Sequence, residues 1–451
     1  MSDTPLTDAI RSYRAGVLSR LHVPAHGGGP GNPELEQLWP GLLAWDVTEQ
    51  PDLDDLSHPD GPIRASQALA RDFFGAAEAF YLTGGATLGV QAAILAATGR
   101  GGALLVARDA HRSVLGACLA TDAELVLLDP RRDAVSGASL GPSPDEVLAA
   151  LRRWPDIRAV LVNYPSYLGI APDLAGIAAA AHDQGAVVIA DAAHGAHFGL
   201  HPDLPPAALG LGADIVVLGM HKTGGALTQS AMLLLAPGAL ALRDDVRRAL
   251  GLLGTSSPSY LLLVSLEQAV HALRRAIPDR LAGAIAAAQA VGGTARIQTD
   301  RPQDPLRIAW RAEKAAEIVD ALALQGVRGE YVDGETALYC VHFGAGPSDL
   351  APLRAVLEDL GAPPAARAAD RREPRRARPQ GALLAARRQV PLLEAVGSVA
   401  AEVVAPVPPG IPVLWPGEEV TAEAARELRL RLGGGQRIMG IDQQKVWVVA
   451  E

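Results

Sequence analysis

Asp214-Ile215-Val216-Val217-Leu218-Gly219-Met220-His221-Lys222-Thr223-Gly224-Gly225 is an apolar run that breaks into a polar, glycine-containing loop. A second apolar run, Ala186-Val187-Val188-Ile189-Ala190, lies upstream and ends in Asp191-Ala192-Ala193-His194-Gly195. Short runs rich in β-branched residues and bounded by glycine are typical of buried strands. The sequence therefore predicts two buried strands, of which one ends in an acid and the other in a lysine.

An aspartate and a lysine at two strand ends are the pair of groups that pyridoxal phosphate (PLP) requires. The lysine amine bonds to the cofactor's aldehyde, and the carboxylate keeps the pyridine nitrogen protonated. Most lysines are solvated surface charges, so a lysine alone would be weak evidence. Lys222 follows a histidine and an apolar strand, with Asp191 upstream, and this combination predicts a PLP site.

Apolar runs alternate with alanine- and leucine-rich stretches of helical period from about Ala76 onward. This alternation predicts an α/β fold with a mostly parallel central sheet that helices cover on both faces. Functional loops then lie at the carboxyl ends of the strands, where Asp191 and Lys222 fall. The expected strands are 103–107, 123–128, 159–163, 187–190, 215–218 and 232–235, and the expected helices are 89–98, 143–154, 174–184 and 259–276.

The 451 residues are enough for two or three domains. We expect an N-terminal arm over 1–75, a large PLP-binding domain over 76–293 and a smaller C-terminal α/β domain over 294–451, with strands near 306–310 and 336–343. An arginine- and proline-rich stretch near 363–380 is predicted to be a solvated linker, since no aromatic residues interleave it as in an RNA-binding surface.

Composition narrows the class of protein. The formal net charge of −10 argues against a general nucleic-acid binder. Two cysteines indicate a reducing compartment and fit buried apolar positions better than metal ligation. The start of the chain shows no secretory signal, and no apolar segment reaches the roughly 20 residues of a membrane span. We therefore expect a cytoplasmic protein that binds neither nucleic acid nor membrane.

Further segments at predicted strand ends fit a cofactor pocket. The small residues of 81–89 would let backbone N–H groups approach a phosphate, and Thr87 adds a hydroxyl at the start of a helix. Such a turn is also common for structural reasons, and this one lacks the lysine of a P-loop. His111 follows the strand 103–107, where an imidazole can either stack on a flat ring or serve as an ordinary polar loop residue.

Two more groups of residues leave alternatives open. Tyr167, after the strand 159–163, fits a pocket wall and loop packing about equally well. His194, His197 and His201 raise the possibility of a metal cluster, but the intervening glycine and apolar residues give no complete ligand set. We therefore predict that His194 contacts the cofactor and that no metal is bound.

Taken together, these segments resemble the bacterial Orn/Lys/Arg decarboxylases, PLP-dependent enzymes of the aspartate aminotransferase fold (fold type I). The resemblance extends over most of the chain and is closest to the shorter form, which lacks an additional N-terminal domain. The matching segments are 24–29, 46–49, 53–56, 83–89, 111–113, 164–169, 191–198, 221–223, 227–230, 255–260, 408–412 and 416–418.

The resemblance implies specific roles at the site. Lys222 would carry the cofactor, Asp191 would pair with the pyridinium and His111 would stack on the ring. His194 would lie near the ring substituents, and His221 would lie beside the phosphate and, like Lys222, could return a proton to the substrate. Gly85, Ala86 and Thr87 would hold the phosphate, and Ser256 and Ser257 would reach the partner's site in a homodimer.

The implied reaction is decarboxylation of arginine, lysine or ornithine to the corresponding amine, a polyamine or its precursor. Arginine is the first choice because the short form resembles arginine decarboxylases. A basic side chain needs an acceptor for its distal charge. The candidates are Glu49, Asp54, Asp55 and Glu418, each equally compatible with a structural role, with Tyr167 at the pocket wall.

The chain also departs from the family pattern. Gly219 and Met220 stand where the family has Ser-Thr before His-Lys, Ala192 replaces a glutamate, Val407 replaces a tyrosine, and the Pro-Arg-Glu-Ala element is degraded around 379–382. These departures keep a second hypothesis open, a different PLP reaction on the same scaffold, such as that of an aminotransferase or lyase. A non-catalytic regulatory relative is disfavoured because Lys222, Asp191 and His111 are present.

Overall fold

The computed structural model describes residues 2–275, 277–332, 335–362, 372–407 and 410–450. The fold is α/β, as the sequence predicts. The chain forms two compact units that alternate along the sequence. Unit 1 consists of residues 1–96, 192–197 and 214–278, and unit 2 consists of residues 97–191, 198–213 and 279–451.

Unit 1 is built on three antiparallel strands in the order β1-β9-β8, with Phe80 and Val217 both opposite Leu233. Every residue of these strands is buried, and all but Glu78 at the start of β1 are apolar or aromatic. Helix α4 packs closely on this sheet: a Cβ added at Gly89 would lie 2.7 Å from side-chain atoms of Leu82 and Val217. The strands are β1 (Glu78–Leu82), β8 (Ile215–Leu218) and β9 (Ala231–Leu235), and α4 is Gly85–Thr98.

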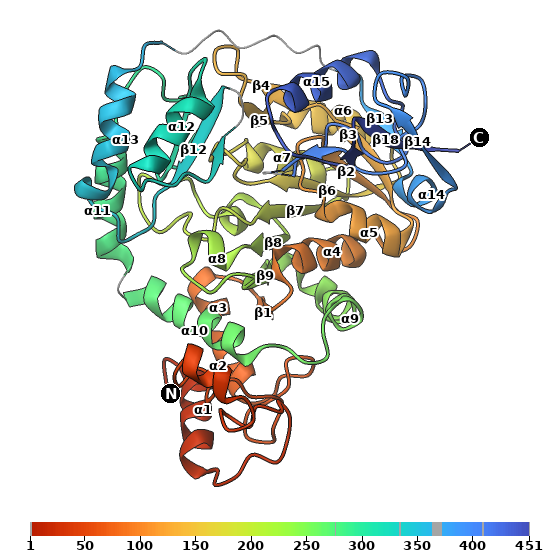
Figure 1. Ribbon diagram of the computed structural model, residues 1–451. Coiled ribbons are helices and arrows are strands. Elements are labelled where there is room, and N and C mark those ends of the chain that lie inside the picture. The colour runs from red at the N-terminus through yellow and green to blue at the C-terminus, as the bar shows by residue number, and fades with distance from the viewer. Residues whose placement is uncertain (1, 276, 333–334, 363–371, 408–409, 451) are drawn as a thin grey trace. The chain divides into compact units, whose positions relative to one another are not determined.

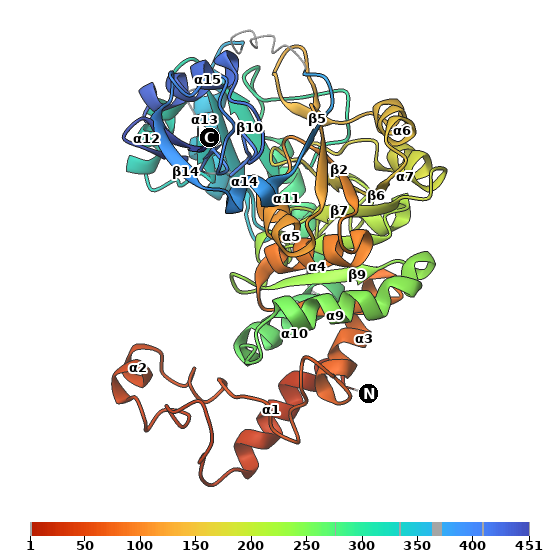
Figure 2. The ribbon, with the colours of Figure 1, turned by 90° about the vertical axis from the view of Figure 1, so that its right-hand side faces the viewer.

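The N-terminal segment of unit 1 is anchored by a buried glutamate. Glu267 of α10 accepts hydrogen bonds from the N–H groups of Leu6 and Thr7, each at 2.8 Å, at the start of α1. Figure 2 shows α1 beside α3, with α2 on the stretch of chain that connects them. The other helices of unit 1 are α1 (Pro5–Gly16), α2 (Pro33–Leu38), α3 (Pro62–Phe74), α8 (Met220–Thr223), η2 (Pro237–Leu242), α9 (Arg243–Leu253) and α10 (Tyr260–Arg275).

Unit 2 contains the strands β7-β6-β2-β3, which are parallel, followed by the antiparallel edge strand β13. Helices α6 and α7 lie side by side (Figure 1). Helix α6 begins with a capping box, in which Ser143 and Glu146 each bond the other's backbone N–H. The elements are β2 (Ala103–Ala107), α5 (Ser113–Thr121), β3 (Glu124–Leu128), β4 (Arg131–Arg132), β5 (Ser139–Gly141), α6 (Pro144–Arg153), β6 (Ile157–Asn163), α7 (Leu174–His182), β7 (Val187–Ala192), η1 (Ala208–Leu211) and β13 (Arg375–Ala377).

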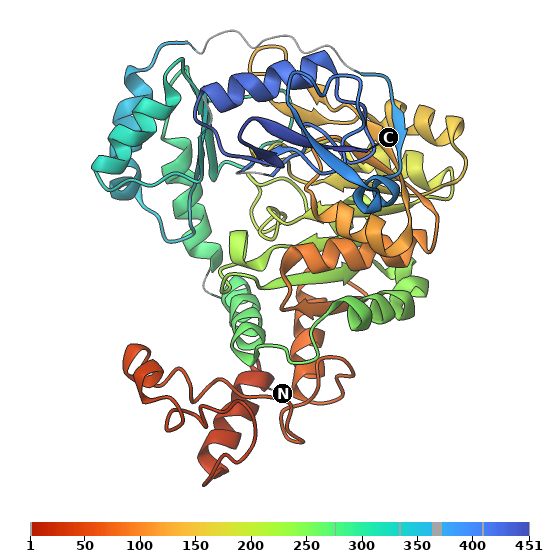
Figure 3. The ribbon, with the colours of Figure 1, turned by 45° about the vertical axis from the view of Figure 1, so that its right-hand side comes forward.

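The rest of unit 2 forms smaller sheets. Helix α12 packs on the sheet β10-β12-β11, and α15 shares a hydrophobic core with β14 and β18 of the sheet β14-β18-β17 (Figure 3). The elements are α11 (Ile277–Gln289), β10 (Arg307–Arg311), α12 (Ala315–Leu324), β11 (Tyr331–Val332), β12 (Thr336–Cys340), α13 (Pro347–Asp359), α14 (Pro379–Leu384), β14 (Arg387–Pro391), β15 (Ala405–Pro406), α15 (Ala422–Gly433), β16 (Ile438–Met439), β17 (Ile441–Asp442) and β18 (Lys445–Val449).

The arginine-rich stretch differs from the expected linker. Residues 363–371 lie outside the described part of the chain, but 375–377 form β13 beside β3, and α14 follows. Arg376 forms ion pairs with Glu124 and Asp156, which explains how a polar segment can form a sheet edge. Within the described residues, no helix is both long and apolar enough to cross a lipid bilayer.

Candidate active site

The lysine-bearing turn belongs to unit 1 and begins where β8 ends. Helix α8 follows Gly219, and Lys222 N–H donates to the Gly219 carbonyl at 3.0 Å. The Lys222 Nζ atom lies 3.0 Å from His194 Nε2. An ammonium group at this distance donates to a neutral imidazole. The structure therefore brings together two of the residues that the sequence predicts for the cofactor site.

Close backbone packing fixes this turn. A Cβ added at Gly219 would lie 2.4 Å from the Ala193 carbonyl oxygen, so any other residue would require the backbone to move. The Thr223 hydroxyl accepts a hydrogen bond from Ala196 N–H at 3.1 Å. Met220 is fully buried and contributes its side chain to the core. Both ends of the turn are thus attached to the segment that contains His194.

The start of α4 contains the residues that the sequence predicts to hold the phosphate. Gly85 has φ +73°, a conformation that favours glycine, and the first helical turn leaves N–H groups without helical partners. Thr87 is exposed and Ala86 is half-buried. A Cβ at Gly85 would lie 3.7 Å from the Gln229 carbonyl, in the loop that follows α8. The helix start and the lysine-bearing turn therefore belong to one region of unit 1.

Three other residues predicted for the cofactor site also lie in unit 1. His221 is oriented by the Ser230 carbonyl, which lies 3.2 Å from both the backbone nitrogen and the Nδ1 atom of His221. Ser256 and Ser257 are exposed on the segment between α9 and α10. The Ser257 N–H donates to the Thr255 hydroxyl at 3.2 Å.

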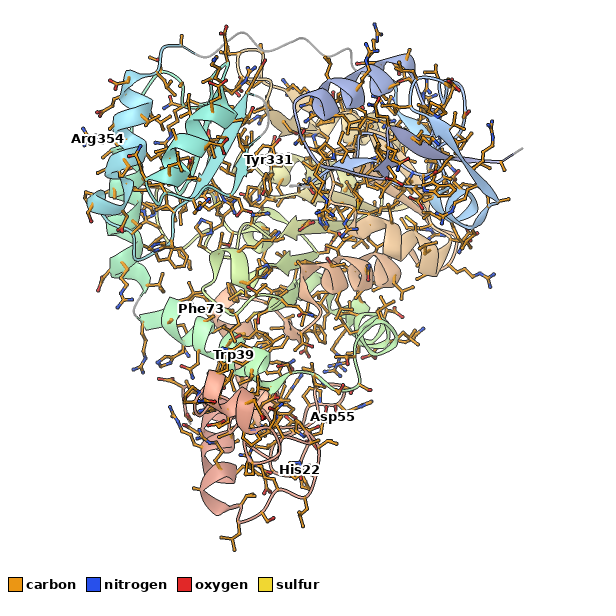
Figure 4. The ribbon with its side chains drawn as sticks, viewed as in Figure 1. His22, Trp39, Asp55, Phe73, Tyr331 and Arg354 are labelled. Carbon is orange, nitrogen blue, oxygen red and sulfur yellow. The ribbon has the colours of Figure 1, made fainter. Side chains whose placement is uncertain are left out.

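The acidic candidates of unit 1 differ in the number of hydrogen bonds that their carboxylate oxygens accept. Asp54 is buried and caps the start of α3, and Tyr260 donates to its carbonyl at 2.7 Å. Asp55 accepts from the Ser57 N–H and hydroxyl and lies in the N-terminal segment (Figure 4). The Glu49 Oε1 atom is buried and accepts no hydrogen bond, whereas Oε2 accepts one from Thr48. The Asp54 carboxylate accepts from the N–H groups of Asp55, Asp60, Gly61, Ile63 and Arg64.

In unit 2, Asp191 is the second-last residue of β7 and is buried. In the parallel register of β6 and β7, Asp191 is directly opposite Asn163, and the Asp191 carbonyl accepts from Tyr164 N–H at 2.9 Å. The Asn163 side-chain amide donates to the Asp109 carbonyl at 2.8 Å, which joins the end of β6 to the loop after β2. Polar side chains therefore gather at the carboxyl ends of these parallel strands, as expected for the fold.

His111 lies in the same loop after β2. Its Nδ1 atom accepts a hydrogen bond from Ser113 N–H at 3.2 Å, at the start of α5. A Cβ added at Gly410 would lie 4.0 Å from His111 Nε2, so the chain passes close to the imidazole there. Pro408 and Pro409, part of the family-like segment that contains Gly410, lie outside the described residues.

Glu418 and Tyr167 occupy different surroundings in unit 2. The Glu418 carboxylate binds the Arg108 guanidinium through both oxygens and also accepts from Trp415 N–H at 3.0 Å. Arg108 Nε contacts Asp129 at 2.8 Å. Tyr167 lines a cavity of about 660 Å³ and donates its hydroxyl to Glu330 at 3.0 Å.

Sequence reasoning assigned no role to Arg108, Asp109 or Asn163. Arg108 and Asp109 are the first two residues after the apolar run 103–107, and Asn163 closes the run 159–163, so all three lie near strand ends, as Asp191 and Lys222 do. The described residues contain no cluster of His, Cys, Asp and Glu suited to hold a metal ion.

The chain is similar to known proteins along most of its length. Residues 4–312 match the major domain of the Orn/Lys/Arg decarboxylases, and residues 372–431 match their C-terminal domain. An arginine decarboxylase of Bacillus anthracis is 30% identical over 97% of this chain and 95% of its own length.

Solved structures show the same fold. The constitutive lysine decarboxylase of E. coli superposes with a TM-score of 0.80 at 18% identity, covering 99% of this chain and 82% of that one. A structure of SPT with PLP as internal aldimine superposes with a TM-score of 0.55 at 19% identity, covering 79% of this chain and 84% of that one. The glycine-initiated helix and the lysine–histidine pair fit such a cofactor. The chain therefore belongs to the Orn/Lys/Arg decarboxylase family of PLP-dependent amino-acid decarboxylases.

Proposed function

We propose that this protein removes the α-carboxylate of a basic L-amino acid, arginine before lysine or ornithine, with PLP held on Lys222. The observation that carries the proposal is the Lys222–His194 contact on the turn after β8. The sequence contains only two other lysines, Lys314 and Lys445. Lys314 is an exposed ion-pair partner of Glu317, and Lys445 is exposed at the start of β18. Neither provides an alternative site.

When bound, PLP supplies an electron sink for whichever bond at the substrate α-carbon lies perpendicular to its ring. Lys222 Nζ would bond to the cofactor aldehyde, and His194 Nε2, which accepts from Nζ, would orient the amine. Asp191 would hold the proton on the pyridine nitrogen, and His111 would cover one face of the ring. The N–H groups at Gly85, Ala86 and Thr87 would bind the phosphate. Lys222 or His221 would return a proton to the α-carbon.

The substrate's distal cation needs an anionic partner. We leave out Asp54, because five backbone N–H groups already use its carboxylate, and Glu418, because Arg108 and Trp415 N–H use both its oxygens. Glu49 and Asp55 remain candidates, as does Tyr167 for the pocket wall. Glu49 is supported by its buried oxygen that accepts no hydrogen bond.

We also propose that the protein is a homodimer in which Ser256 and Ser257 reach the partner's site. Both serines are exposed, as are the apolar side chains Leu18, Leu21 and Val23 of the N-terminal segment. Exposed apolar side chains grouped on one segment are typical of surfaces that bind another protein. A second copy of this chain would cover them.

A second candidate function is another PLP reaction on the same scaffold. It is favoured by the lysine turn, because Gly219 and Met220 have no side-chain hydroxyl to offer the phosphate. The buried Ala192, where the family has a glutamate, supports the same alternative.

One experiment separates the two functions. PLP-loaded protein is incubated with arginine, lysine, ornithine and a panel of neutral and acidic amino acids, and CO2, amine and keto acid are measured. Release of CO2 with an equal amount of amine from a basic amino acid supports decarboxylation, and Lys222→Ala serves as the inactive control. If PLP is bound but none of the three basic amino acids yields CO2 and amine, the decarboxylase proposal is wrong.

A further inference from the structure

The cavity of about 660 Å³ in unit 2 lies at the carboxyl ends of β2 and β6. Asp109, Asn163, Ser166 and Tyr167 line it from these strand ends. Its volume is within the range of small-molecule sites. Because Asp109 is two positions before His111, the cavity begins at the loop proposed to cover the cofactor.

The arginines that line this cavity already have partners. Arg108 is paired with Asp129 and Glu418, Arg311 with Glu335, and Arg431 with Glu427. Arg132 donates to the Gly137 carbonyl at 3.1 Å, and the exposed Glu423 lies at the rim. Arg372 lines the cavity and donates its backbone N–H to Asp129. The cavity is therefore not a simple anion site.

Asp109 differs from the other acids of the cavity. Its carboxylate accepts a hydrogen bond from the Ser139 hydroxyl, and no cation of the described residues lies within ion-pair distance of it. Burial raises the pKa of the Asp109 carboxyl, while Ser139 and the charge of Arg132 lower it in part. Asp133, in contrast, accepts from the Val135 and Ser136 N–H groups and the Ser136 hydroxyl. A cation that enters the cavity would therefore be stabilised more by the Asp109 carboxylate than by the other acids.

Two aromatic rings complete the surroundings. Tyr167 and Tyr331 both line the cavity and meet edge to face with ring centres 5.8 Å apart (Figure 4 labels Tyr331). The Tyr167 hydroxyl is held by Glu330. The face of an aromatic ring attracts an ammonium or guanidinium group.

We propose that this cavity binds the distal cation of the substrate, with Asp109 as its anionic partner and Tyr167 as the ring against which it lies. The ligand class is a guanidinium or alkylammonium group on a short aliphatic chain. This inference rests on the proposed function, and it makes Asp109 a specificity-determining residue in place of Glu49 or Asp55.

The first test measures binding without reaction. Agmatine, which has a guanidinium group and no α-carboxylate, is titrated into PLP-loaded protein by calorimetry. Replacing a charged hydrogen-bond partner weakens binding by roughly 10- to 150-fold, which is the loss expected for Asp109→Asn. Asp133→Asn, in the same cavity, should change affinity less than about threefold. Unchanged binding by Asp109→Asn, or the loss appearing in Glu49→Gln, overturns the inference.

The second test measures selectivity. Citrulline has the shape of arginine without its charge, so the ratio of kcat/KM for arginine over citrulline should fall in Asp109→Asn. Tyr167→Leu should lower the same ratio and Tyr167→Phe should preserve it, which keeps the inference testable if Asp109→Asn does not fold. An unchanged ratio in Tyr167→Leu and in any folded Asp109→Asn counts against the inference.

The two proposals fail separately. If the wild type produces no CO2 and amine but agmatine binds in an Asp109-dependent way, the decarboxylase proposal fails and the cation site stands. If the wild type decarboxylates arginine and Asp109→Asn keeps the same selectivity, the cation site fails and the decarboxylase proposal stands.

Discussion

Lys222 can be tested as a single residue with unusual clarity, because the chain has only three lysines. Borohydride reduction of the PLP-loaded protein should fix the cofactor on the peptide that contains Lys222. Lys222→Ala should yield no reduced adduct, while Lys314→Ala and Lys445→Ala should yield the wild-type amount. Peptide mapping by mass spectrometry checks this, and an adduct on Lys314 or Lys445 would show that the assignment is wrong.

The sequence predicts site residues where the expected chemistry follows directly from position along the chain. Lys222 and Asp191 each come at the end of an apolar run, so their location at strand ends was predictable. Whether a carboxylate is already occupied by hydrogen bonds or ion pairs was not predictable from the sequence. Asp54 is occupied by N–H groups up to ten positions away, and Glu418 by Arg108, which is 310 positions away. Only the folded chain shows that these acids already have partners.

At the scale of elements, the Arg108–Glu418 pair joins the loop after β2 to the segment before α15. Both side chains are about 10% exposed or less. Glu418→Ala should lower the free energy of unfolding by about 1–3 kcal/mol, because the buried Arg108 guanidinium loses one acceptor while Asp129 remains. The neighbouring Glu419 is exposed, and Glu419→Ala should change stability by no more than about 0.5 kcal/mol. Urea denaturation of both variants measures the difference, and equal losses would contradict this role.

Helix α3 depends on an acid that lies seven positions before its N-cap. Its N-cap, Gly61, has no side chain, and Asp54 accepts the N–H groups at the helix start instead. Asp54→Ala should cost about 1–3 kcal/mol of unfolding free energy, because these donors lose their acceptor. Asp55→Ala is the matched control and should cost clearly less, since Asp55 bonds only the Ser57 turn. Thermal or urea unfolding distinguishes them, and a larger loss in Asp55→Ala would count against the cap.

The predicted elements show which signals are local. The runs 103–107 and 215–218 match β2 and β8 residue for residue, because continuous apolar residues mark buried strands. Helix α3 was expected only as part of an arm of loops and short helices, since its cap is not adjacent in sequence. Strand β13 was missed because its Arg376 is neutralised by acids from other elements. Long-range contacts therefore decide the elements that a local pattern does not show.

At the scale of the whole molecule, the expected state is a dimer or an oligomer built from dimers. Leu18 and Leu21 are almost fully exposed, and Leu18→Asp with Leu21→Asp should shift the protein toward monomers and lower its activity. Leu324 is equally exposed on α12, and Leu324→Asp should leave assembly unchanged. Sedimentation at several concentrations checks this, and a stable, fully active wild-type monomer would contradict the dimer.

The division into three domains stays a prediction.

The contact between Gly219 and Ala193 also limits how this protein can evolve. A serine at position 219, as in the family pattern, would place its Cβ 2.4 Å from a backbone oxygen that no change of the Ala193 side chain removes. Replacing Met220 by threonine would leave a gap beside Gly224, where a Cβ would now lie 2.6 Å from the Met220 side chain. Each residue of the family pattern is therefore unfavourable when it is introduced alone. Gly219 and Met220 therefore depend on their neighbours, and introducing the family pattern requires several substitutions together with a backbone shift.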